Sequence, residues 1–123
     1  MTGLTNDQAR TLLSEAFANL LDPNESVETL SRYFSAACVQ EVDGERMDYA
    51  QFLDHARGIK RSIRWARVTF EALIVEGSTV ADIHIVESER TDAARMKLKV
   101  IAFNTVDQGK IVRVDELTRL IQG

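Results

Sequence analysis

The chain has 123 residues, of which 45% are hydrophobic and 28% charged, and its net charge is −4. These values are ordinary for a soluble globular protein, so we expect one domain over residues 1–123. The negative charge argues against nucleic acid or an anionic membrane surface as a partner. The single cysteine, Cys38, excludes an internal disulfide and a cysteine-based metal cage.

The first residues are polar, and no segment approaches the roughly 20 apolar residues of a membrane span. The sequence therefore predicts a cytoplasmic protein that does not contact a membrane.

Three amphipathic helices are expected in the first half. Thr5 can cap the first helix, with Gln8 as its capping-box partner, and Asp48 can cap the third with Gln51. Pro23 ends the first helix, because the residue before a proline is disfavoured in the helical region. A shorter helix carrying Val27, Leu30 and Phe34 lies between them, and an extended piece over 37–42 leads to a turn at Asp43-Gly44.

Four alternating strands are expected between Ile63 and Ile121, joined by turns at 76–79, 91–94 and 107–109. These turns predict a register in which one face is apolar and packs under the helices. The predicted pairs include Ile74 with Ala81, Ala72 with Ile83, Phe70 with Ile85, Ile83 with Ala102, and Val100 with Glu116. Three polar residues fall on the apolar face: Glu87, Asn104 and Glu116.

Helices followed by a long meander, ending in Gln108-Gly109-Lys110-Ile111-Val112-Arg113-Val114-Asp115-Glu116-Leu117, resemble the SnoaL-like branch of the nuclear-transport-factor-2-like superfamily. The resemblance implies an α+β fold, a cone-shaped α+β barrel in which three N-terminal helices pack in a curved, mostly antiparallel sheet. It also implies a site for a hydrophobic small molecule. It does not imply one reaction, because the superfamily contains isomerases, cyclases, dehydratases, hydrolases and binding modules.

Glu116 and Asn104 are the catalytic candidates. Burial should raise the pKa of the Glu116 carboxyl, which suits a general acid or base near neutral pH. The resemblance agrees, since an acidic residue of the last strand often points into the pocket. The alternative is a solvated Glu116 at the rim of the sheet, or one paired with an arginine. The rest of the expected pocket lining consists of Phe17, Tyr33, Phe52, Phe70, Ile85, Glu87 and Val100.

A second set of candidates comes from Glu89-Arg90-Thr91-Asp92, which resembles a motif of limonene-epoxide hydrolases. The resemblance implies that Arg90, Asp92 and Glu116 would hold and activate a water molecule. The hairpin is shorter here, however, so Arg90 and Asp92 fall at a turn, and a solvated charged turn is the favoured interpretation.

The histidines offer further candidates. Asp82 and His84 resemble the aspartate and histidine of polyketide cyclases, but the predicted register places both on the outer face, with Glu71 opposite His84 as a structural partner. His55 lies at the edge of the third helix. No pair has the spacing of metal ligands, so the sequence predicts neither a metal nor another cofactor.

The outer sheet face should carry an exposed apolar patch, which predicts a homodimer. The patch comprises Leu73, Val75, Val80, Val86, Ile101, Phe103, Ile111 and Leu117. Three functions remain open: an acid/base enzyme without a cofactor, a ligand-binding module, and a dimeric assembly domain.

Overall fold

The computed structural model describes residues 3–123. The fold is α+β with a curved six-stranded sheet, as expected. Its elements in chain order are α1 (Asn6–Leu20), the 3-10 helix η1 (Val27–Arg32), β1 (Phe34–Val42), β2 (Glu45–Met47), α2 (Tyr49–Ser62), β3 (Ile63–Glu76), β4 (Thr79–Arg90), β5 (Arg95–Asp107) and β6 (Lys110–Gln122). The expected second helix is thus a 3-10 helix, and Phe34 begins β1.

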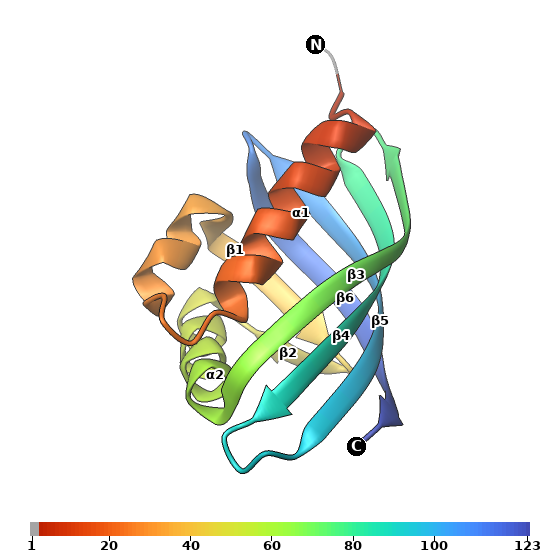
Figure 1. The fold of residues 1–123 in the computed structure, drawn as a ribbon. Coiled ribbons are helices and arrows are strands. Elements are labelled where there is room, and N and C mark those ends of the chain that lie inside the picture. Colours follow the sequence, from red (N-terminus) through yellow and green to blue (C-terminus); the bar gives the residue numbers. More distant parts are fainter. Residues whose placement is uncertain (1–2) are drawn as a thin grey trace.

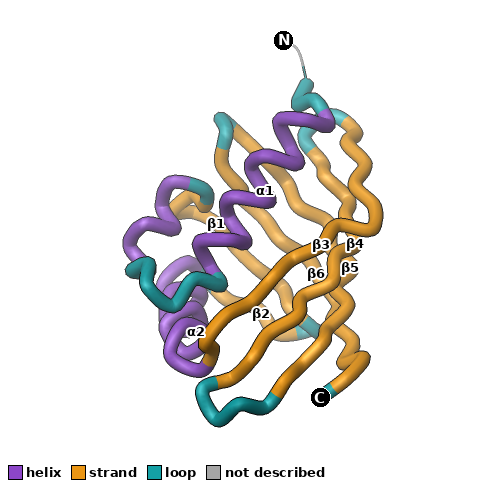
Figure 2. Tube along the Cα trace, viewed as in Figure 1, coloured by secondary structure: helices purple, strands orange, loops and turns teal. Residues whose placement is uncertain are grey.

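The strands lie in the order β2-β1-β6-β5-β4-β3, with β1 and β6 parallel and the other neighbours antiparallel. Figure 1 shows α1 crossing the concave side of β3, while α2 lies beside β1 and β2. In Figure 2 only short loops separate β3, β4, β5 and β6. This is the cone-shaped arrangement expected of a nuclear-transport-factor-2-like fold.

The helices begin where their capping residues predict. Gln8 donates its backbone N–H to the Thr5 hydroxyl at 3.1 Å, and Gln51 donates to the Asp48 carboxylate at 2.8 Å. In both cases the glutamine side chain accepts from the backbone N–H of the capping residue, which completes the capping box. The buried residues of α1 are Ala9, Leu13, Ala16 and Asn19.

The predicted register is wrong between β4 and β5. Arg90 donates its backbone N–H to the carbonyl of Ala94, and Ala93 lies in the left-handed region with φ of 70°. This is a three-residue loop that ends in a left-handed residue, where a four-residue turn was expected. Pairing therefore shifts by one residue, so that Asp82 faces Ala102 and Ile83 faces Ile101.

A one-residue shift exchanges the two faces of a strand, because side chains alternate. Asp82 and His84 consequently lie on the concave face, and the prediction that they lie outside is wrong. Strand alternation places Ala81, Ile83, Ile85 and Glu87 on the convex face, which also contradicts the prediction.

β3 adapts to this shift through a bulge. Near the turn, Ala72 pairs with Ile83 as predicted, but Phe70 pairs with His84 and not with Ile85. One extra residue, Glu71, is accommodated between them. Phe70 therefore stays on the concave face, whereas Ile74 lies on the convex face and is 65% exposed.

The last hairpin differs from its predicted register by two residues. Gln108 and Gly109 both have positive φ, 51° and 77°, and form a two-residue turn. A further irregularity follows, so that Glu116 pairs with Ala102, not Val100. A two-residue shift keeps the faces, so Asn104 and Glu116 lie on the concave side as expected.

Candidate functional site

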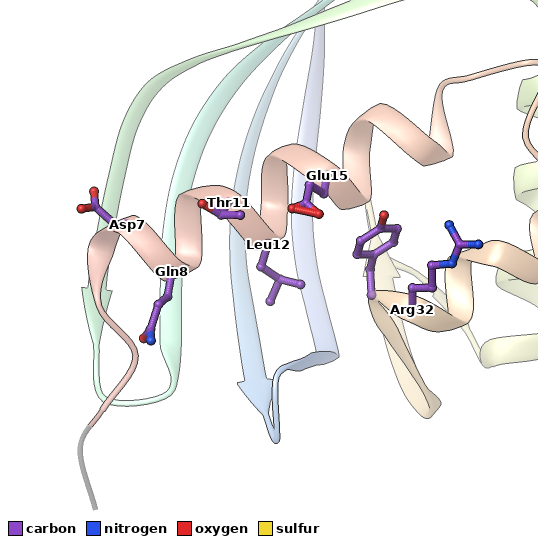
Figure 3. Close-up of a pocket in the computed structure, with 7 residues that line it drawn as sticks. Asp7, Gln8, Thr11, Leu12, Glu15 and Arg32 are labelled. Atoms are coloured by element: carbon purple, nitrogen blue, oxygen red, sulfur yellow. The ribbon is translucent and has the colours of Figure 1, made fainter.

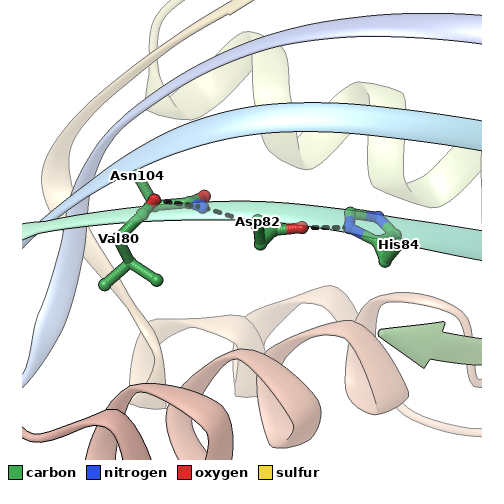
Figure 4. A network of polar contacts seen from close by, with 4 residues as sticks. All are labelled: Val80, Asp82, His84 and Asn104. Atoms are coloured by element: carbon green, nitrogen blue, oxygen red, sulfur yellow. Dashed lines mark hydrogen bonds and ion pairs between the residues drawn. The ribbon is translucent and has the colours of Figure 1, made fainter. Parts of the chain in front are cut away.

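A buried polar network lies on the concave face of β4 and β5. His84 Nδ1 lies 2.5 Å from Asp82 Oδ1, and Asn104 Nδ2 donates to Asp82 Oδ2 at 2.8 Å. Asn104 Nδ2 also donates to the carbonyl of Val80 at 3.2 Å. Figure 4 shows Asp82 between its two partners. All three side chains are buried, which makes this network the candidate site.

The contact with Asp82 fixes the orientation of the His84 imidazole. Because the Asp82 carboxylate accepts a hydrogen bond, neutral His84 carries its proton on Nδ1. Nε2 then keeps its lone pair, and it makes no hydrogen bond within residues 3–123. A buried histidine oriented by a carboxylate can remove a proton from a bound molecule.

Aromatic rings surround the imidazole. The Phe17 ring of α1 lies 4.7 Å from that of His84, and the Phe70 ring of β3 lies 5.8 Å from it, centroid to centroid. Phe17 and Phe70 also stack on each other at 6.0 Å. Two of the residues expected in the pocket lining thus contact His84 directly.

Glu116 supplies a second titrating group on the same face. Burial raises the pKa of its carboxyl to about 7; His84 opposes the shift, and the carboxylates of Asp82 and Asp43 add to it. Asp43 lies in the β1–β2 turn, where it accepts hydrogen bonds from the backbone N–H and the hydroxyl of Thr118. Glu116 is partly exposed, so solvent or a bound molecule can reach it.

The register arranges the concave face in rows that cross the sheet. Asp82 and Glu116 share one row, separated by Ala102, and His84 stands in the next row beside Val100. The row beyond His84 is wholly apolar. We call it the apolar strip; it comprises Val68, Val86, Leu98 and Leu120. Its residues are partly buried or exposed, so the strip is accessible next to the polar network.

A cleft of about 160 Å³ lies between α1 and β3 beside this site. Its wall includes Phe17 and Phe70, the two rings that contact His84, and Val68 of the apolar strip. Ligand sites usually measure roughly 300–1,000 Å³, so the cleft alone suits only a small molecule.

A larger, open depression of about 480 Å³ lies elsewhere, between α1 and η1. Figure 3 shows Asp7, Thr11 and Glu15 along α1 and Arg32 on η1. Tyr33, which was expected in the pocket lining, lines this depression.

The remaining pocket candidates fall into two groups. Val100 is buried on the concave face beside His84, whereas Phe52 packs in the core on Phe34 at 4.7 Å. Ile85 and Glu87 lie on the convex face, and Glu87 accepts from Arg67 at 3.1 Å. The one-residue register shift explains both corrections, because it moves each side chain of β4 to the opposite face of the sheet.

Three other candidates are exposed. Arg90 and Asp92 lie at the β4–β5 turn, where Asp92 accepts from the backbone N–H of Ala94. His55 is exposed on α2. Within the described residues, none of the three makes a hydrogen bond or ion pair with Asp82, His84 or Asn104.

Sequence reasoning did not single out Gln40, a polar residue of the concave face. Gln40 of β1 is buried, and its side-chain Nε2 has no hydrogen-bond partner in the described structure. A polar residue within the alternating β1 pattern was the available signal, but the pairing of β1 with β6 was needed to place it.

Within residues 3–123, no group of three histidine, cysteine, aspartate or glutamate side chains is placed to hold a metal ion. None of the helices in that range is long and apolar enough to cross a membrane.

Comparison with known protein sequences assigns no family. No family model matches the chain. An uncharacterised protein of Schizosaccharomyces pombe is 25% identical over 118 residues, covering 96% of this chain and 91% of that protein.

Solved structures identify the fold. An epoxide hydrolase of the limonene-epoxide-hydrolase-like type from M. tuberculosis superposes with a TM-score of 0.72 and 20% identity, over 93% of this chain and 84% of that one. A nuclear-transport-factor-2-like protein of unknown function from Exiguobacterium gives 0.72 and 14%, over 88% and 98%. The chain therefore has the nuclear-transport-factor-2-like fold, whose members include enzymes.

Proposed function

We propose that this protein is a cofactor-independent acid/base enzyme that acts on a small hydrophobic molecule bound to the concave face. The observation that carries the proposal is the buried Asp82–His84–Asn104 network, which stands beside the partly exposed Glu116. Burying such a set of polar groups costs desolvation free energy, and such groups cluster at functional sites.

His84 and Glu116 have complementary roles. Nε2 of His84 accepts a proton from a carbon next to a substrate carbonyl, and the protonated Glu116 carboxyl donates a proton to the carbonyl oxygen. The product of this step is an enol, which can regain a proton at another carbon. Asp82 holds His84 in the required tautomer and stabilises the imidazolium that forms.

The apolar strip supports binding of the rest of the substrate. Val68, Val86, Leu98 and Leu120 present a continuous apolar surface next to His84. Placing an apolar molecule on it removes both surfaces from water, which favours binding.

The test is exchange of the α′-protons, on C6, of a small enone, 2-cyclohexenone, for deuterium, followed by NMR in deuterated buffer. Wild-type protein should accelerate the exchange, and His84→Gln should lower the rate by about 10²-fold or more. Glu116→Gln should also slow it, and the wild-type rate should fall above about pH 7 as Glu116 loses its proton. Glu87→Gln, on the convex side of the same strand, is the control.

Exchange that is equally fast in His84→Gln would remove this residue from the mechanism. Binding of the enone without any exchange would leave a ligand-binding module.

The convex face supports a second function, assembly into a homodimer. Large apolar side chains are exposed there, and we call them the convex patch: Ile74, Ile101, Phe103 and Leu117. Of the residues expected in such a patch, Val80 and Ile111 are fully buried, and Leu73 and Val75 pack against the core. Val86 belongs to the apolar strip on the opposite face.

A further inference from the structure

Two buried amide side chains on the concave face lack one hydrogen-bond partner each. They are Asn104 Oδ1 and Gln40 Nε2, in residues that are 1% and 5% exposed. Buried polar atoms in native structures are normally paired, so each of these two needs an explanation.

The orientation of the Asn104 amide is determined by its neighbours. Its nitrogen has two acceptors, the Asp82 carboxylate and the Val80 carbonyl. A flipped amide would direct its oxygen at both acceptors, which is unfavourable. Oδ1 is therefore an acceptor without a donor.

Gln40 lies across the sheet from Asn104. Both residues pair with Val114 of β6, Gln40 from the parallel strand β1 and Asn104 from the antiparallel strand β5. They share one row, and with neighbouring strands about 5 Å apart their Cα atoms are separated by roughly 10 Å. Both side chains lie on the concave face, so the free donor and the free acceptor belong to one row of the sheet, on either side of Val114.

We propose that Gln40 and Asn104 recognise a hydroxyl group on the ligand, so that the protein selects apolar molecules that carry one. The hydroxyl donates to Asn104 Oδ1 and accepts from Gln40 Nε2. A hydroxyl is the smallest organic group that does both. The inference rests on the proposed function in one respect, because it assumes that the ligand occupies the same concave face.

The order of the rows gives the ligand a direction. The row of Gln40 and Asn104 is followed by the row of Glu116 and Asp82, then by His84 and the apolar strip. The row of Asn104 and that of His84 are about 13 Å apart along the strands. The hydroxyl lies at one end, the acid and the base follow, and the apolar part rests on the strip.

The test compares three matched probes: benzyl alcohol, benzyl methyl ether and toluene. Binding is followed by NMR through the side-chain amide signals of Gln40 and Asn104. Wild-type protein should bind the alcohol at least about 10-fold more tightly than toluene or the ether, because only the alcohol satisfies both amides. The two amide signals should shift with the alcohol.

Gln40→Met is the diagnostic variant, since it keeps the side-chain length and removes the donor. It should reduce the preference for the alcohol to about 3-fold or less and leave the free protein as stable as before or more stable, because an unpaired buried amide is gone. Gln122→Met is the matched control, with an exposed glutamine at the end of β6. It should keep the full preference.

Three results would overturn the inference: equal binding of alcohol and toluene, an unchanged preference in Gln40→Met, or no binding of the alcohol at millimolar concentration. Equal binding is also the result expected if a water molecule alone bridges the two amides. A clear preference for the alcohol without proton exchange on the enone would remove the proposed reaction and leave hydroxyl recognition standing. Proton exchange on the enone without a preference for the alcohol would leave the proposed reaction standing and remove hydroxyl recognition.

Discussion

The two faces of the sheet differ in which side chains they bury: the concave face buries polar groups, and the convex face exposes apolar ones. On the concave face, Asp82, His84 and Asn104 are buried and hydrogen-bonded to one another. On the convex face, charged residues form exposed ion pairs such as Arg67–Glu87, while Phe103 and Leu117 are 60% and 65% exposed.

Each face is therefore unfavourable for an isolated chain in water, but for a different reason. Buried polar groups cost desolvation, and they persist where a ligand or a reaction needs them. Exposed apolar groups leave area in contact with water, and they persist where another surface covers them. This difference is the reason for proposing chemistry at the concave face and association at the convex one.

The largest expected difference between the faces concerns stability. Asp82→Ala removes the acceptor of both His84 and Asn104, leaves buried donors unpaired, and should cost about 3–5 kcal/mol. Glu87→Ala on the same strand breaks only the exposed pair with Arg67 and should cost less than about 1 kcal/mol. Urea denaturation measures both. Similar losses would contradict the assignment of the two residues to different faces.

The next effect is the pH dependence caused by Glu116. Its folded-state pKa of about 7 lies above the ordinary value of 4.5, so the free energy of unfolding falls as pH rises from about 4.5 to about 7 and stays lowered above that. Glu116→Gln should therefore increase stability at pH 8 by roughly 2–3 kcal/mol and change it little at pH 4. Asp115→Asn, on the exposed neighbouring residue, is the control. A gain that is the same at both pH values would exclude this cause.

Association through the convex patch gives the third effect. We expect a homodimer, and Phe103→Glu should weaken it by about 30-fold or more, equivalent to about 2 kcal/mol, because a charge enters a desolvated contact. Lys110→Glu introduces the same side chain at the exposed β5–β6 turn, where it changes the net charge even more, and should leave the dimer intact. Sedimentation across micromolar concentrations distinguishes these outcomes. A single species of 13.8 kDa at every concentration would rule the dimer out.

Much of the fold could be predicted from local signals. The capping boxes at Thr5 and Asp48 place the helix starts, and the Gly77-Ser78 turn gives the pairing near the β3–β4 turn. The concave position of Asn104 and Glu116 also follows, since a two-residue error in register does not exchange faces.

The buried network could not be predicted, because two irregular positions have no sequence signal. The left-handed residue of the β4–β5 loop is Ala93, where a glycine or asparagine would have indicated the three-residue turn. The bulge at Glu71 likewise has no signal in the sequence. The three-residue loop moves each side chain of β4 to the opposite face of the sheet, which places Asp82 and His84 on the concave face. The bulge at Glu71 keeps Phe70 on the same face beside them.

The smallest expected effect tests this turn directly. Ala93 has φ of 70°, a conformation that is unfavourable for a residue with a side chain. Ala93→Gly should relieve this strain and stabilise the protein by about 0.5–1 kcal/mol, despite the greater freedom of glycine in the unfolded chain. Ala94→Gly, at the adjacent position with ordinary φ, should instead destabilise by a similar amount. Opposite signs in urea denaturation support the three-residue loop. Destabilisation by both variants would contradict it, and with it the placement of Asp82 and His84 on the concave face.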